Sequence, residues 1–338
     1  MSHPVADTFG RAIAALRADG DMKAVLDQLG QLTDQHIEDL DVAAARLQPT
    51  PADAVKALLQ SRGQSTAPEA LVPGITSLDD SIPGPGGSLP VRIYTPADAG
   101  PFPLVVYFHG GGWVIADKDV YDRGARGLSK ESNAVVVSVD DRRSPEHKFP
   151  AAWDDALAAY RWVAENAQQL HGNASRIALA GESAGGNLAL ATAVAVRDAG
   201  LSHPPCHVVA VYPVTQTSVN TESYLENAIA KPLNRAMIEW FVDQLINSKD
   251  DLKDTRLQLI DADLAALPSV TLVNADIDPL RNDGSKMEDA LRKARVPVER
   301  RNYDGVTHEF FGMGAVVEKA REAQAWAGDR LLEAFAGA

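Results

Sequence analysis

The sequence predicts an α/β fold in which helices flank a mainly parallel central sheet. Short apolar runs rich in β-branched residues recur along the chain, and helical segments separate most of them. Each run is apolar throughout, which is typical of a parallel strand that is covered on both faces. The runs that predict strands are residues 91–94, 104–108, 135–139, 177–180, 208–212, 270–274 and 298–303.

The N-terminal part of the chain predicts helices that precede this sheet. Residues 8–17 and 22–29 each have an amphipathic pattern. A third short helix is expected at residues 52–60, after the break at Pro49-Thr50-Pro51. Residues 63–87 are richer in Pro, Gly and Ser, and we interpret them as a linker and the first loops of the main domain.

Later helices are predicted at residues 151–166, 187–198 and 316–335. The interval between Tyr212 and Val270 is too long for a simple crossover and contains an amphipathic stretch at residues 235–246. We expect this insertion to pack with the N-terminal helices as a lid over the carboxyl edge of the sheet. The predicted division is a cap segment (1–62), the first part of the core (63–212), a cap insertion (213–262) and the second part of the core (263–338).

Composition limits the classes of partner and the location. The 338 residues contain 32 Lys and Arg against 46 Asp and Glu, a net charge of −14, which argues against nucleic-acid partners and anionic lipid surfaces. No apolar run approaches the roughly 20 residues that span a bilayer, so stable membrane insertion is not expected. The N-terminus lacks a signal-peptide pattern, and the single cysteine, Cys206, suits a reducing compartment. These features predict a cytoplasmic protein.

The run at residues 177–180 leads into Gly181-Glu182-Ser183-Ala184-Gly185, and a helical pattern follows. A Gly-x-Ser-x-Gly sequence between a strand and a helix predicts a nucleophile elbow. The glycines lack the Cβ atoms that would collide where strand and helix pack closely. Strained backbone at the tip would expose the Ser183 hydroxyl to a substrate.

A serine hydroxyl needs a base, usually a histidine oriented by a carboxylate, and in folds with this elbow the order along the chain is Ser, Asp, His. His308 follows the last predicted strand, whereas the other histidines are less well placed. Asp276 and Asp278 both follow the strand at residues 270–274, where ligands gather in open α/β sheets. Asp278 is modestly preferred from the pattern because Pro279 would fix its turn.

Three consecutive glycines follow the strand at residues 104–108. Glycines let a backbone approach a ligand and direct N–H groups toward it. Gly111 and Gly112, together with the N–H group of Ala184, therefore predict an oxyanion hole.

Together these motifs resemble the hormone-sensitive-lipase-like family of α/β-hydrolase esterases. The resemblance rests on His-Gly-Gly-Gly-Trp at 109–113, Ser-Pro-Glu-His-Lys-Phe-Pro-Ala-Ala at 144–152, Gly-Glu-Ser-Ala-Gly-Gly at 181–186 and Asp-Pro-Leu-Arg at 278–281. It runs from about Pro90 to the C-terminus, and the N-terminal helices fit the family's cap. It implies the α/β-hydrolase fold with a helical cap, and it makes Asp278 the acid of a triad with Ser183 and His308. The implied activity is hydrolysis of short- to medium-chain carboxylic esters through an acyl-enzyme, without cofactor or metal.

The chain departs from the family pattern in one block. Asp141-Arg142-Arg143-Ser144 stands where Tyr-Arg-Leu usually precedes Ala-Pro-Glu-His, a departure that concerns the substrate range rather than the chemistry. We interpret His109, Glu146 and Glu182 as structural groups. The candidate substrate-binding residues are Trp113, Tyr212, Trp240 and Phe241.

Other functions use the same parts. An amidase or deacetylase would pass through the same tetrahedral geometry and is the alternative within enzymes. A non-catalytic small-molecule receptor on this fold characteristically lacks the triad histidine, which is present here. A metal hydrolase is weaker still, since Asp276, Asp278 and Asp283 are loosely spaced with no histidine pair nearby. Fold analogy suggests a homodimer formed through the last strand.

Overall fold

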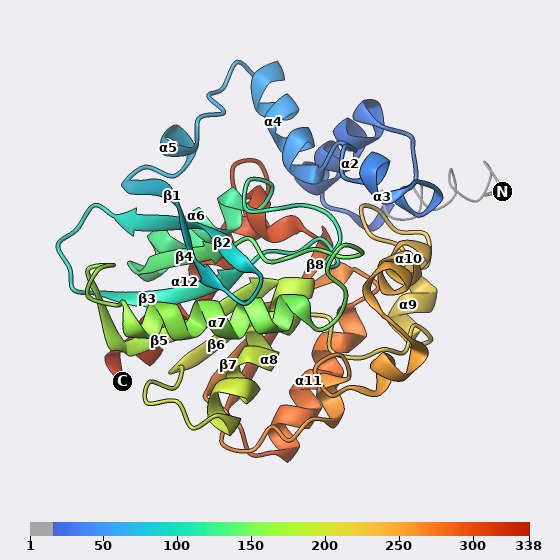
Figure 1. Cartoon of the computed structure of the whole chain (residues 1–338). Helices are drawn as coiled ribbons and strands as arrows, with labels where there is room; N and C mark the ends of the chain where they lie inside the picture. The colour runs from blue at the N-terminus through green and yellow to red at the C-terminus, as the bar shows by residue number, and fades with distance from the viewer. Residues whose placement is uncertain (1–15) are drawn as a thin grey trace.

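The computed structural model describes residues 16–338, so most of the helix predicted at residues 8–17 lies outside the described part. Within it, eight strands form one sheet in the order β1-β2-β4-β3-β5-β6-β7-β8 (Figure 1). The strands from β3 to β8 are parallel to one another, and the β1–β2 hairpin joins β4 in antiparallel fashion. The strands are β1 (Ile75–Gly84), β2 (Gly87–Pro96), β3 (Phe102–Phe108), β4 (Val135–Val139), β5 (Gly172–Glu182), β6 (His207–Val211), β7 (Ser269–Ile277) and β8 (Val298–Thr307).

Helices cover both faces of this sheet, which confirms the predicted α/β architecture. One face packs against α7, α8 and α11, and the other against α6 and α12. The helices are α2 (Gly20–Leu32), α3 (Val42–Ala45), α4 (Pro51–Ser61), α5 (Pro68–Leu71), α6 (Asp122–Ser132), α7 (Ala151–Glu165), α8 (Ala184–Asp198), α9 (Glu222–Glu226), α10 (Arg235–Leu245), α11 (Arg281–Lys293) and α12 (Glu318–Ala336). None of the helices in residues 16–338 combines the length and the apolar character that crossing a bilayer requires.

Two sequence-based expectations were wrong in detail. The stretch interpreted as linker and loops contains β1, an edge strand that pairs along its whole length with β2. Most side chains of β1 are exposed to solvent, so the strand needs no apolar run and carries none. Helix α8 begins at Ala184, directly after the serine, and not near Asn187, because the turn between β5 and α8 is tight.

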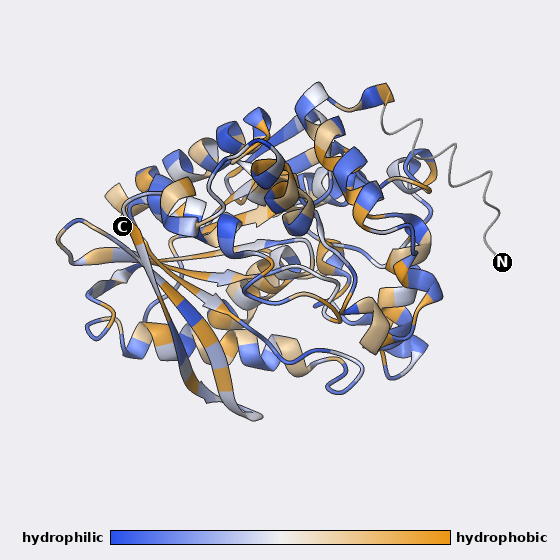
Figure 2. Cartoon of the chain, turned by 90° about the horizontal axis from the view of Figure 1, so that it is seen from above, coloured by the Kyte–Doolittle hydropathy of each residue, from blue (hydrophilic) through white to orange (hydrophobic). Residues whose placement is uncertain are grey.

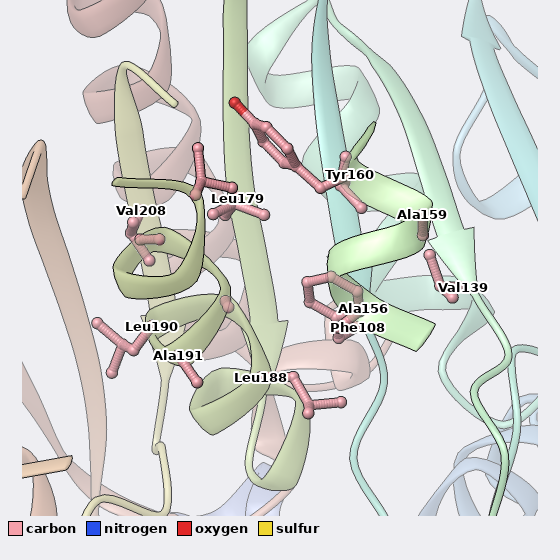
Figure 3. Close-up of a cluster of buried hydrophobic side chains, with 14 of the residues drawn as sticks. Phe108, Val139, Ala156, Ala159, Tyr160, Leu179, Leu188, Leu190, Ala191 and Val208 are labelled. Carbon is pink, nitrogen blue, oxygen red and sulfur yellow. The ribbon is translucent and has the colours of Figure 1, made fainter. Parts of the chain in front are cut away.

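The main core lies between the sheet and its helices. Figure 2 shows hydrophobic residues gathered along the central strands. In Figure 3, Phe108, Leu179 and Val208 from three neighbouring strands pack in one cluster with side chains of α7 and α8. Small residues on α7, among them Ala156 and Ala159, allow the helix to lie close to the sheet. This packing fixes the carboxyl ends of β5, β7 and β8, from which the candidate site is built.

Segments far apart in the sequence lie together beside the carboxyl edge of the sheet. Figure 1 shows α2 and α3 next to α9 and α10. Between them, Asn234 donates a hydrogen bond to Glu38 over 2.8 Å, and Lys231 lies 3.1 Å from the His36 ring. The N-terminal helices and the insertion are therefore in direct contact.

Arg46, directly after α3, ties the N-terminal helices to the core. Its guanidinium donates to the carbonyl oxygens of Val114 and Ser144, each over 2.9 Å. It also forms a two-pronged pair with Glu146, at 2.6 and 2.8 Å. The hydrogen bond from Arg46 lowers the pKa of Glu146 to about 2. One side chain thus connects the N-terminal helices to the loop after β3 and to the block that contains Ser144.

Replacing Arg46 with Met should loosen the N-terminal helices. The carbonyl oxygens of Val114 and Ser144 would lose their donor, which we expect to lower the free energy of unfolding by about 1–3 kcal/mol. Hydrogen exchange should accelerate within residues 20–61. Arg62→Met is the control, because its exposed side chain makes no hydrogen bond to another residue in 16–338. Equal exchange in the two variants would contradict this role of Arg46.

Candidate active site

Ser183 occupies a strained turn between β5 and α8. Its backbone has φ 59° and ψ −118°, a conformation that costs a non-glycine residue about 1–3 kcal/mol. Close packing of backbone maintains this strain. A Cβ atom on Gly181 would lie 2.1 Å from the carbonyl oxygen of Gly185, and one on Gly185 would lie 2.0 Å from that of Phe108. The Ser183 N–H donates to the Val211 carbonyl over 2.9 Å, which ties the turn to β6.

The loops after β7 and β8 bring two further side chains to this serine. The Nε2 atom of His308 lies 2.9 Å from Ser183 Oγ, and its Nδ1 atom lies 2.7 Å from Asp278 Oδ2. The other oxygen of Asp278 accepts the N–H of Leu280 over 2.8 Å. All three hydrogen-bonded side chains are buried, with exposed fractions of 6% for Ser183, 0% for Asp278 and 3% for His308.

The structure brings together Ser183, Asp278 and His308 and leaves Asp276 outside. Asp276 instead pairs with Arg17 at 2.8 Å and with Arg281 at 3.0 Å. Asp283 is fully buried and accepts hydrogen bonds from the Thr215 N–H and the Gln216 side chain. These aspartates therefore have separate partners. Within residues 16–338, no three acidic, histidine or cysteine side chains are arranged to hold a metal ion.

The environment of His308 favours the protonated ring. Burial works against a charged imidazolium, but the charge of Asp278 and its hydrogen bond outweigh burial and raise the pKa of His308 above its ordinary value. A ring held in this way accepts a proton at Nε2 while Asp278 stabilises the charge that forms.

The loop after β3 presents Gly111 and Gly112 beside the serine. Both have positive φ, 101° and 60°, and a Cβ atom on Gly112 would lie 2.4 Å from the ring of Phe241. His109 anchors this loop: its Nδ1 atom lies 2.7 Å from the Gly110 carbonyl oxygen, and its Nε2 atom lies 3.2 Å from Asp140. Burial opposes the charge of His109, but Asp140 and Asp141 raise its pKa to about 9. His109 thus holds the loop in place and lies outside the hydrogen-bonded series of Ser183, His308 and Asp278.

Comparison with known proteins agrees with this geometry. A family model described as "alpha/beta hydrolase fold" matches residues 105–312. Carboxylesterase NlhH of Mycobacterium tuberculosis is 39% identical over 281 residues, which cover 81% of this chain and 88% of that protein. Esterase LipI of the same organism is 39% identical over 260 residues, covering 74% and 80% of the two chains. A crystallised Pyrobaculum calidifontis esterase superimposes with a TM-score of 0.81 at 35% identity, over 90% of this chain and 97% of that one.

The chain belongs to the α/β-hydrolase family. The match confirms both the fold and the hormone-sensitive-lipase-like group that the sequence motifs predicted.

Glu182, next to the nucleophile, is a buried structural group of this hydrolase. Its carboxyl group accepts hydrogen bonds from the hydroxyl groups of Tyr107 and Tyr212. Burial raises the pKa of Glu182 to about 7, although both hydrogen bonds act in the opposite direction. The Tyr212 ring centroid lies 4.4 Å from that of His308, so the two rings pack against each other.

Two cavities of the hydrolase meet at Ser183. The smaller, of about 50 Å³, has no charged residue among the described residues that line it, and Trp113 contributes to its wall. The larger, of about 560 Å³, has both apolar and charged walls and includes His308. Phe241 lines both cavities, whereas Tyr212 and Trp240 line neither. Trp240 instead packs edge-on against Phe241, with ring centroids 5.4 Å apart.

Sequence reasoning missed the charged residues of the larger cavity. Arg46 comes from the N-terminal helices, Arg143 from the loop after β4, and Glu309 follows His308. Only the departure at Arg143 gave a signal in the sequence, because the others carry no motif of their own.

The elbow should not tolerate a methyl group at Gly185. In Gly185→Ala the added carbon would meet the Phe108 backbone, and we expect the free energy of unfolding to fall by about 3 kcal/mol or more. Chemical denaturation measures this change. Gly20→Ala is the matched control, since nothing lies within 4 Å of its added Cβ. Equal stability of the two variants would show that the elbow is not closely packed.

Proposed function

We propose that this α/β-hydrolase is a serine carboxylesterase that cleaves short- to medium-chain carboxylic esters through an acyl-enzyme. The observation that carries the proposal is the hydrogen-bonded chain from Asp278 through His308 to Ser183, at 2.7 and 2.9 Å, facing two cavities. The names of the related proteins support the same class of substrate, since NlhH is a carboxylesterase and LipI an esterase.

In the proposed mechanism, Ser183 Oγ attacks the ester carbonyl while His308 Nε2 takes its proton. Asp278 stabilises the resulting imidazolium through Nδ1. The N–H groups of Gly111, Gly112 and Ala184 donate to the oxyanion, and losing one such donor typically costs about a hundred- to a thousandfold in rate. His308 then protonates the leaving alcohol. Water attacks the acyl-enzyme with His308 again as base, which releases the carboxylic acid and restores Ser183.

The cavities support a limited substrate size. A space of about 50 Å³ with uncharged walls suits a short alkyl or acyl group, and the larger cavity suits the other part of the ester. We propose that residues 1–62 and 213–262 form a cap over the core at 63–212 and 263–338; of this cap, the structure describes residues 16–62 and 213–262. A cytoplasmic location and a homodimer stay predictions.

An amidase or deacetylase would use the same side chains. Turnover of a nitrophenyl ester compared with that of the matching anilide separates the two activities, because only the leaving group differs. A receptor without catalysis would bind a ligand and give no burst of acyl-enzyme.

Removing the nucleophile tests the proposal directly. Ser183→Ala should lower kcat on a nitrophenyl ester by on the order of a millionfold, as in other triad enzymes. Asp278→Asn should lower it by about ten thousandfold, because the imidazole loses the partner that holds its tautomer. Asp276→Asn is the matched control and should keep most of the activity, since Asp276 pairs with arginines outside the triad. Substantial turnover by Ser183→Ala would overturn the mechanism.

Phe241 should set the chain-length limit. Its ring lines both cavities and lies against Gly112, so Phe241→Ala should join the two spaces. We expect the optimum in a series of nitrophenyl esters from acetyl to dodecanoyl to move toward longer chains, with kcat/KM rising about tenfold for the longer esters. Leu332→Ala is the control, because Leu332 is an exposed residue of α12 that lines neither cavity. An unchanged profile for Phe241→Ala would show that another wall limits chain length.

A further inference from the structure

We propose that Arg143 makes the enzyme selective for esters that carry a carboxylate, or a similar anionic oxygen group, on the part of the substrate held in the larger cavity. This inference rests on the proposed esterase function and names its substrate class. Arg143 stands in the block that departs from the family pattern, at the position of the usual leucine.

The two consecutive arginines of this block have different surroundings. Arg142 is held by the buried carboxylate of Asp155, which accepts from its backbone N–H over 2.9 Å and from its guanidinium over 2.8 Å. This pair fixes the loop after β4. Arg143, in contrast, lines the larger cavity, which Ser183 and His308 also line.

The guanidinium of Arg143 has N–H donors that make no hydrogen bond within the described residues. One N–H donates to the Ala116 carbonyl oxygen over 2.6 Å. Among the described residues, no carboxylate oxygen lies within 4.0 Å of it, and its charge acts only over a longer distance on Asp140 and Glu146, which pair with His109 and Arg46. A guanidinium carries five N–H donors and keeps its charge at every physiological pH. The remaining donors are thus available to a ligand.

The other charged groups of the cavity have partners of their own. Arg46 is paired with Glu146, and Lys231 lies beside His36. Each lining carboxylate accepts at least one hydrogen bond: Asp27 from Lys23, Glu38 from Asn234, Asp117 from the backbone of Asp119 and Val120, and Glu309 from Tyr121. Arg143 is therefore the cation of this wall that is best placed to recognise an incoming anion.

A carboxylate is the chemistry that fits this donor set. Two parallel N–H···O bonds from a guanidinium match the spacing of carboxylate oxygens and are stronger than neutral hydrogen bonds. The smaller cavity has no charged wall among the residues described, so an anionic group would be excluded from it and directed to the larger one.

Two matched ester series test the inference and show which half of the substrate bears the anion. Monoesters of dicarboxylic acids carry the carboxylate on the acyl side, and acetate esters of ω-hydroxy acids carry it on the alcohol side. Each ester is compared with its carboxamide analogue, with spacers of increasing length. The measured quantity is kcat/KM for wild type, Arg143→Leu, Arg143→Lys and Lys118→Leu. Lys118 lies 3.9 Å from Asp140 and outside the cavity wall, so it controls for a general change of charge.

In at least one series, wild type should prefer the carboxylate over the carboxamide. Arg143→Leu should lower kcat/KM for the carboxylate ester by about 10- to 100-fold and change that for the carboxamide by less than about threefold. Arg143→Lys should retain part of the preference, and Lys118→Leu all of it. Equal losses on both esters would reduce Arg143 to a support for the Ala116 loop and overturn the inference, as would an unchanged preference.

Failure of the esterase proposal would be recognised separately. Hydrolysis of nitrophenyl acetate, a small neutral ester, depends on Ser183 and should be found in wild type and in Lys118→Leu. If wild type fails to cleave it, calorimetric binding of the same dicarboxylate monoesters still tests Arg143. Binding that weakens about tenfold or more in Arg143→Leu supports the anion site, and equal binding overturns it.

Discussion

Ser183 keeps its backbone φ of 59° because backbone atoms on either side of it are in direct contact, at positions where no side chain would fit. The elbow between β5 and α8 closes only because Gly181 and Gly185 bring strand, helix and the end of β3 into direct contact. The same contact aligns the start of α8 with the glycine loop, so the proposed nucleophile and oxyanion donors share one rigid frame. The large core on either side of the sheet supplies the stability that offsets this local strain.

Around this frame, buried ionisable groups of the hydrolase have specific partners. His308 takes its orientation from Asp278, and His109 lies between Asp140 and the Gly110 carbonyl. Glu182 accepts hydrogen bonds from two tyrosine hydroxyl groups, and burial raises its pKa to about 7. Buried ionisable groups with specific partners hold their neighbours in fixed positions, which is what a preorganised site requires.

The cavities are formed by tertiary packing of segments that are far apart in the sequence. Their walls combine the N-terminal helices, the insertion that contains α10, and loops of the core. Arg46 connects these parts through bonds to Val114, Ser144 and Glu146. The proposed chemistry and selectivity are thus divided: the sheet edge positions Ser183, Asp278 and His308, while the N-terminal helices, the insertion and the loop that carries Arg143 shape and charge the space around them. This division explains how one fold serves many substrates.

The sequence by itself determined the features that depend on residue types at a short, fixed spacing. The elbow requires glycine at fixed spacing, and the buried parallel strands require apolar runs. His308 could be assigned as the base because, in folds with this elbow, the histidine follows the serine along the chain. Pattern alone preferred Asp278 over Asp276 only modestly, because both aspartates follow the same strand, and the family resemblance was needed to assign Asp278. The pattern missed β1, because an exposed edge strand needs no apolar run. Only the tertiary structure decided the direction of those carboxylates, the two cavities and the placement of Arg143. Each of these depends on segments that lie far apart along the chain and meet only after folding, so no local spacing encodes them.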